Sequence, residues 1–121
     1  MTGDALNGRL LTFVVMRTTA VLLAVLVLGH FAVTHVVNDV AATGASFALR
    51  RWSSALWLAW DATMLGAALA HAGCGVWLVI DERASKPARR RALQLSLAVV
   101  TAVVFAVGMT AIVVAATKGT T

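Results

Sequence analysis

The sequence predicts an all-α membrane protein whose three transmembrane helices run up, down and up. Of its 121 residues, 60% are hydrophobic and only 12% are charged, whereas a soluble globular domain has about 25% charged residues. A soluble domain of this size leaves much of its chain exposed and could not cover so much apolar surface. Three charge-free stretches, at 18–37, 62–80 and 92–117, come close to or exceed the roughly 20 residues that a helix needs to cross a bilayer.

The three helices are expected over about 12–40, 53–81 and 88–117, within a single membrane domain at 1–121. None of the stretches shows the alternation of a barrel strand, so each has to satisfy its own backbone hydrogen bonds as a helix. The first connection contains Asn38, Asp39 and Gly44, and the second runs from Asp81 to Arg91 with the single proline between them. Both connections are short, so neighbouring helices are antiparallel.

Basic residues predict the orientation. Seven lie beside the N-terminus or in the second connection, namely Arg9, Arg17, Arg83, Lys86, Arg89, Arg90 and Arg91, against three on the other side, Arg50, Arg51 and Lys118. The positive-inside rule places the N-terminus in the cytoplasm and the C-terminus outside the cell (inner or cytoplasmic) membrane. Trp52, Trp57 and Trp60 are expected at the outer interface and Trp77 at the inner one, where indole rings prefer to lie.

Several classes of function are excluded. The single cysteine, Cys74, rules out an internal disulfide and a multi-cysteine metal site, and is expected to be a packing residue. The net charge of +5 comes from residues that flank the apolar stretches, and the Arg89–Arg91 run lacks interleaved aromatics, so no nucleic-acid partner is expected. No serine or threonine has a histidine–acid partner at a plausible spacing, so no catalytic residue is assigned.

Polar residues within the membrane need a reason to be there. At 1.5 Å per residue, His71 is expected about 15 Å from the cytoplasmic side. His30, which follows Arg17 by 13 residues, is expected about 20 Å from that side if the membrane begins at Arg17, and His35 lies close to the outer interface. An interhelical hydrogen bond, a proton relay or axial ligation of haem iron would each explain such a histidine. The relay is disfavoured because no carboxylate is expected at a matching depth, although Asp61 stands near the outer end of the second helix.

Small residues surround these histidines. Glycines and alanines crowd the sequence from Gly66 to Gly75 around His71, and Gly29 precedes His30. They would leave room for the flat face of a porphyrin, and they equally permit close helix packing. Since three helices do not easily enclose a haem, a haem site would need further helices from a partner subunit.

The run from His71 to Glu82, HAGCGVWLVIDE, resembles the haem-ligand helix of the hydrophobic membrane anchor subunit of bacterial succinate dehydrogenase, which carries His-Ala-x-x-Gly-x-Trp-x-Val followed by an acidic residue. The segment Val15-Met-Arg17-Thr-Thr-Ala20 is similar to the family's Arg-x-Thr-Ala helix opening. The basic connection with Pro87, followed by Leu93-Gln94-Leu95, also agrees. The resemblance covers residues 12–118.

The resemblance implies a haem b anchor that passes electrons from succinate oxidation to membrane quinone. It implies a second membrane anchor subunit, an iron–sulfur subunit and a flavoprotein subunit as partners. His71 matches the axial haem ligand, and Arg17 matches a basic residue near the haem propionates and the quinone pocket. In anchors with two haems, the first helix supplies the second ligand, for which His30 is the better candidate and His35 the reserve.

The chain departs from the family at the quinone pocket. The family's commonest form has Asp-Tyr after the ligand helix, whereas this chain has no tyrosine. Glu82 takes the aspartate place and Arg83 the tyrosine place, or Asp81 serves after a shift of one residue. The alternative function is a small three-helix transport or assembly protein whose histidines only pack and bind no haem.

Overall fold

The computed structural model describes residues 3–118, with side chains from residue 7 onward. This part of the chain is all helical, as predicted, and three of its helices are long and apolar enough to span a membrane. Helix α1 covers Gly3–Phe31 and continues as a π-helix over Ala32–Val37, α3 covers Ala55–Arg83, and α4 covers Pro87–Lys118. A 3₁₀ turn at Val40–Ala42 and the short helix α2 at Ala45–Trp52 connect α1 to α3.

Two helix boundaries differ from the prediction. α1 begins at Gly3 rather than near residue 12, because the helix extends through the polar residues that precede the apolar stretch. The segment that was expected to be an open connection contains α2, so Trp52 belongs to α2 and α3 starts at Ala55. Local sequence explains the remaining ends. Asp39 accepts a hydrogen bond from the backbone of Ala41 at the 3₁₀ turn, and Pro87 opens α4, a position where its missing N–H costs nothing.

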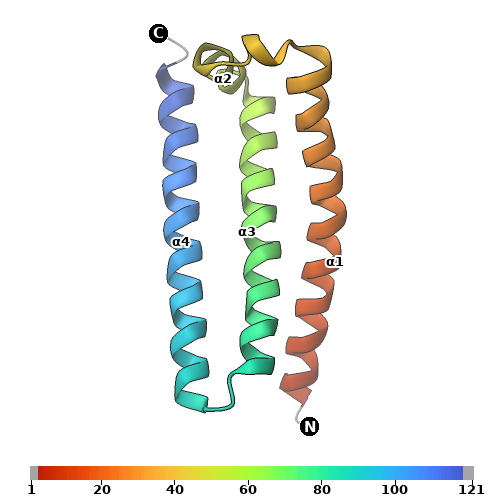
Figure 1. Ribbon diagram of the computed structural model, residues 1–121, viewed down its shortest axis with the longest axis vertical. Helices are drawn as coiled ribbons and strands as arrows, with labels where there is room; N and C mark the ends of the chain where they lie inside the picture. Colours follow the sequence, from red (N-terminus) through yellow and green to blue (C-terminus); the bar gives the residue numbers. More distant parts are fainter. Residues whose placement is uncertain (1–2, 119–121) are drawn as a thin grey trace.

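The three long helices form a single layer and do not close into a bundle. α3 lies in the middle, and both α1 and α4 pack mainly on it (Figure 1). α1 begins at the end where α3 joins α4, and α2 lies across the opposite end (Figure 1). Among the described residues, only Leu26, Ala67 and Ile112 are buried hydrophobic residues.

The layer has no interior core that could support a soluble fold. In each long helix, only 6% of the most apolar 18-residue window is buried within the chain. Large apolar side chains therefore cover both faces of the layer, and water is the wrong solvent for them. The chain is a multi-pass membrane protein, as predicted.

Candidate functional site

His71 is held by α1 through Thr19. The Thr19 hydroxyl lies 2.6 Å from the carbonyl oxygen of Val15 and 3.1 Å from His71 Nδ1. A threonine has a single hydroxyl hydrogen, and the short contact to Val15 uses it. Thr19 therefore accepts from Nδ1–H, which leaves the lone pair of the neutral imidazole on Nε2.

The Nε2 atom of His71 has no hydrogen-bond partner among residues 7–118. A half-buried imidazole that is fixed by a hydrogen bond at one nitrogen and open at the other has the arrangement of a metal-ligating histidine. The residues present at His71 thus suit an iron-bound group.

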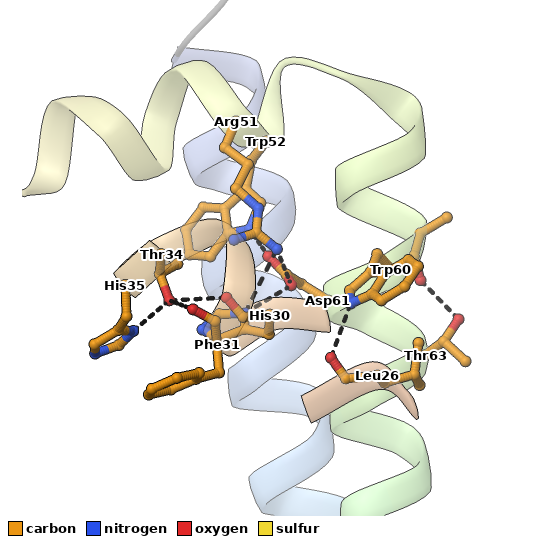
Figure 2. A network of polar contacts seen from close by, with 11 residues as sticks. Leu26, His30, Phe31, Thr34, His35, Arg51, Trp52, Trp60, Asp61 and Thr63 are labelled. Carbon is orange, nitrogen blue, oxygen red and sulfur yellow. Dashed lines mark hydrogen bonds and ion pairs between the residues drawn. The ribbon is translucent and has the colours of Figure 1, made fainter. Parts of the chain in front are cut away.

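A second polar cluster lies at the other end of the α1–α3 contact (Figure 2). Asp61 Oδ1 accepts from Arg51 Nη2 at 2.8 Å, and Asp61 Oδ2 accepts from Trp52 Nε1 at 2.8 Å. The side chains of Arg51 and Asp61 are only 6% and 9% exposed. We name Arg51, Trp52 and Asp61 together with His30 the outer cluster.

His30 touches both charges of the outer cluster with the same atom. Its Nδ1 lies 3.5 Å from Asp61 Oδ1 and 3.5 Å from Arg51 Nη2. Both distances are long for a hydrogen bond. A protonated Nδ1 faces Asp61 and leaves the lone pair on Nε2, whereas an unprotonated Nδ1 accepts from Arg51 and leaves the hydrogen on Nε2.

Helix α2 is the element that completes the outer cluster, and sequence reasoning missed it. It carries Arg51 and Trp52 back over the end of α3, where the Arg51 guanidinium also lies 4.4 Å from the ring centroid of Trp57. Arg51 Nε is buried and has no hydrogen-bond partner among the described residues. In the sequence, Arg51 indicated only the orientation of the helices in the membrane. Nothing in the sequence predicts its pairing with Asp61.

The tryptophans expected at the outer interface make contacts within the protein. Trp60 donates from Nε1 to the carbonyl oxygen of Leu26 at 3.2 Å. Its ring also fills the space beside Gly29, where an added Cβ would lie 2.6 Å from Trp60 Cζ2. The expectation that Gly29 leaves room for a porphyrin is therefore wrong, because the indole occupies that side of α1.

His35 lines the same pocket of about 280 Å³ as the outer cluster but makes no hydrogen bond or ion pair with its charges among the described residues. It belongs to the π-helix, stacks on Phe31 with 4.6 Å between ring centroids, and is exposed. Its Nδ1 lies 2.8 Å from the Thr34 hydroxyl, which donates to the carbonyl oxygen of His30 at 2.8 Å (Figure 2). His30 is thus the better enclosed of the two histidines of the first span.

The observed helix register separates the two candidate ligands more widely than the sequence suggested. Thr19 lies beside His71, and His30 follows Thr19 by eleven residues on α1, which corresponds to about 16 Å along the axis at 1.5 Å per residue. The predicted difference in depth, about 5 Å, is wrong because it took Arg17 as the start of the membrane. The same register brings Asp61 to His30, so the expectation of no carboxylate at matching depth is also wrong.

The inner-end candidates do not form one cluster. Arg17 is exposed on α1, with its guanidinium 5.2 Å from the Phe13 ring centroid, and lies near the level of His71. Asp81 pairs with Arg90 of α4 at 3.1 Å, and Glu82 is exposed beside it. Eight residues of α3 separate the level of Arg17 from Asp81, or about 12 Å. Arg17 thus stands with His71, and the acidic pair stands at the helix end.

Several of the small residues of α3 face α4. An apolar groove of about 480 Å³ runs between these helices, lined by Gly66, Ala70, Gly73, Cys74, Thr101 and Phe105 among others. Gly75 instead lies on the α1 side, where an added Cβ would be 3.9 Å from Met16 Cε. The stripe of glycines and alanines thus serves two different faces of α3. Cys74 is a free, half-buried residue, in keeping with the expected packing role.

Comparison with models of known protein families and with curated proteins finds no match for this chain. The features that bear on its function are therefore the two histidine sites. No group of three or more metal-ligating side chains occurs among the described residues. The α1–α3 pair instead contains two separate histidines, His30 and His71, at different levels along the helices.

Proposed function

We propose that this chain is the haem b-binding membrane anchor subunit of a succinate:quinone oxidoreductase, with His71 as an axial haem ligand. The observation that carries the proposal is the contact between Thr19 and His71, which leaves Nε2 as the free nitrogen. The resemblance of the His71–Glu82 run to the ligand helix of succinate dehydrogenase anchors points to the same residue. When bound, haem b supplies one-electron transfer.

The chain's own residues orient and shield that centre. Thr19 fixes the ring of His71, and the apolar side chains of α1 and α3 keep the site at low dielectric. Arg17 lies near the level of His71 on the exposed side of α1, where its guanidinium suits a haem propionate or a quinone carbonyl of the same complex. Asp81 and Glu82 stand at the end of α3, where we assign them to the border of the quinone pocket.

His30 is the proposed ligand of a second haem, and His35 remains the reserve. The separation of about 16 Å between the levels of His71 and His30 removes the crowding that a 5 Å difference would have caused. The Nε2 atom of His30 has no hydrogen-bond partner among the described side chains.

The open faces of the helix layer support the proposed partners. A layer three helices wide cannot surround a porphyrin, and both of its faces carry exposed apolar side chains. We propose that a second membrane anchor subunit covers the α1–α3 face, and that the iron–sulfur and flavoprotein subunits dock at the end that holds the α3–α4 connection. The basic residues of that connection support a cytoplasmic position for this end, in a multi-pass protein of the cell membrane.

The test is a reduced-minus-oxidised optical spectrum of the complex purified through this chain. We expect b-type bands and a co-purifying flavoprotein. His71→Ala abolishes one b-type signal while the helices still insert. Thr19→Val removes the acceptor for Nδ1 and weakens the same signal, whereas Thr19→Ser keeps the hydroxyl and preserves it. A complex with no haem and no flavoprotein would overturn the proposal and favour a transport or assembly protein with packing histidines.

A further inference from the structure

We propose that the groove between α3 and α4 holds one acyl chain of an anionic phospholipid, whose phosphate binds beside Arg91. The headgroup end is the one where α3 joins α4 (Figure 1). The inference does not depend on haem, because His71 faces α1 through its contact with Thr19, whereas the groove lies between α3 and α4.

The length of the groove matches one leaflet of a bilayer. Gly66 and Trp77 line it on α3, and the eleven residues between their positions correspond to about 16 Å along the axis. Half of a hydrocarbon core of ~30 Å is about 15 Å. Beyond Gly66 the side chain of Leu65 fills the gap between the helices, since a Cβ added at Gly108 would lie 2.6 Å from Leu65 Cδ2. A transmembrane helix of a partner would need a groove across both leaflets, so a single acyl chain is the better occupant.

Trp77 gives the groove a polar mouth. Most of the wall is apolar, and its volume of about 480 Å³ is left open by glycines and alanines. The Trp77 side chain stands at the end nearest the α3–α4 connection, is 42% exposed, and has no acceptor for its Nε1–H among the described residues. An indole with an apolar body and a free N–H suits the boundary between acyl chains and headgroups. The ester carbonyl of a bound lipid is the acceptor that this position offers.

Arg91 continues the groove toward the headgroups. Phe105 and Ala98 line the groove on α4, and Arg91 precedes Ala98 by the same seven residues, or two helical turns, that separate Ala98 from Phe105. The Arg91 side chain is exposed and has no hydrogen bond or ion pair within the described part of the chain. The carboxylate of Asp81, one turn past Trp77, is neutralised by Arg90 at 3.1 Å. Arg91 is thus a free cation on the face that leads into the groove.

The charge around this mouth selects the kind of lipid. Residues 81–91 include five basic and two acidic side chains, which leaves an excess of three positive charges. Basic sites between transmembrane helices bind anionic headgroups in preference to zwitterionic ones. A phosphate with a net negative charge, joined to an acyl chain of one leaflet, fits both halves of the site.

The experiment uses contact quenching of Trp77 by brominated acyl chains. The full chain is reconstituted into phosphatidylcholine vesicles with a fixed fraction of phosphatidylglycerol, and either lipid is brominated in turn at the same mole fraction. The signal of Trp77 is the difference between the wild type and Trp77→Phe. We expect brominated phosphatidylglycerol to be preferred about five-fold, the factor that a single cation gives near an anionic surface.

Two arginine variants separate a site from general surface attraction. Arg91→Gln should lower the preference toward one, whereas Arg9→Gln, which removes an exposed cation of α1 on the same side of the membrane, should leave it unchanged. Ala98→Leu fills the groove and should also remove the preference, although Arg91 is still present. None of these positions is in the buried part of the chain, so the helices should insert as before.

Four results would overturn the inference. They are equal quenching by the two brominated lipids, no quenching by either because another occupant covers the groove, equal losses in Arg91→Gln and Arg9→Gln, and an unchanged preference in Ala98→Leu. Each of them would leave the haem proposal intact, because none of these variants touches the Thr19–His71 contact.

Discussion

The two membrane histidines use the same ring nitrogen against very different neighbours. His71 meets a hydroxyl that is already committed to its own helix, and His30 meets an ion pair. Interhelical hydrogen bonds within membranes contribute only about 0.6–2 kcal/mol, so neither contact explains by its strength why an imidazole stands there. What the Thr19 contact determines is the tautomer of His71, and hence which of its nitrogens is free to bind a ligand.

At the α3–α4 connection, variants of the acidic residues can separate effects on stability from effects on function. The side chains of Asp81 and Arg90 are each about half exposed, and such exposed ion pairs contribute about 0–1 kcal/mol to the stability of a fold. Alanine in place of Arg17, Asp81 or Glu82 should therefore leave folding unchanged and lower electron transfer from succinate to quinone. Succinate oxidation measured with a soluble dye should survive. Normal quinone reduction in all three variants would remove these residues from the quinone pocket.

Sequence alone found the histidines and missed their neighbours, for a physical reason. A polar side chain in an apolar stretch stands out from composition, so His30, His35, His71 and Asp61 were all visible. Which of them meet depends on helix register, and register was inferred from Arg17 as a membrane boundary. A long basic side chain tolerates a position inside the helix, so α1 continues past it to Gly3. That shift of the boundary concealed the contact between His30 and Asp61.

At the scale of elements, α1 and α3 pack together at Gly29 because a residue without a side chain leaves room for the Trp60 indole. Trp60 is anchored there by its hydrogen bond to Leu26, so the ring has little freedom to move aside. α2 belongs to the same contact region through Trp52 and Arg51. No long apolar stretch marks this eight-residue helix, and tertiary hydrogen bonds hold it in place, so sequence reasoning missed it.

Gly29→Ala and Gly108→Ala make a matched pair of tests. Each added Cβ would lie 2.6 Å from a side-chain atom, of Trp60 in the first case and of Leu65 in the second. The Leu65 side chain can change rotamer, whereas the Trp60 ring must give up its bond to Leu26. We expect Gly29→Ala to lower the thermal unfolding midpoint of the purified protein by several degrees, and Gly108→Ala to change it little. Equal changes in the unfolding midpoint of the two variants would show that the Trp60 ring can move aside as easily as the Leu65 side chain.

On the scale of the whole molecule, the flat layer leaves the chain without an interior core of its own. The number and type of its helices could be predicted from the sequence, because hydropathy alone decides what crosses a bilayer. The flat arrangement of the helices could not be predicted, since length and composition do not indicate whether α1 packs against α4. Both faces of the layer remain for lipid or for other helices.

The orientation can be tested directly on the full chain. Seven basic residues at one end of the layer against three at the other predict that the α3–α4 connection is cytoplasmic. A reporter that is active only in the cytoplasm should be silent when fused after Thr121 and active when inserted at Ser85. The opposite pattern would invert the topology and move the proposed docking end to the outside.

The Arg51–Asp61 pair also has a consequence for biosynthesis. An aspartate that enters lipid alone costs about 2.5–3.5 kcal/mol at the centre of a helix. Here Arg51, which carries the opposite charge, precedes Asp61 by only ten residues. Arg51 therefore leaves the ribosome before Asp61 and is available to pair with it. The residues of the neutral pair and of the Thr19–His71 contact all precede α4 in the sequence, so these contacts do not need the last helix. The nascent α1–α3 hairpin thus already contains every polar contact of both histidines.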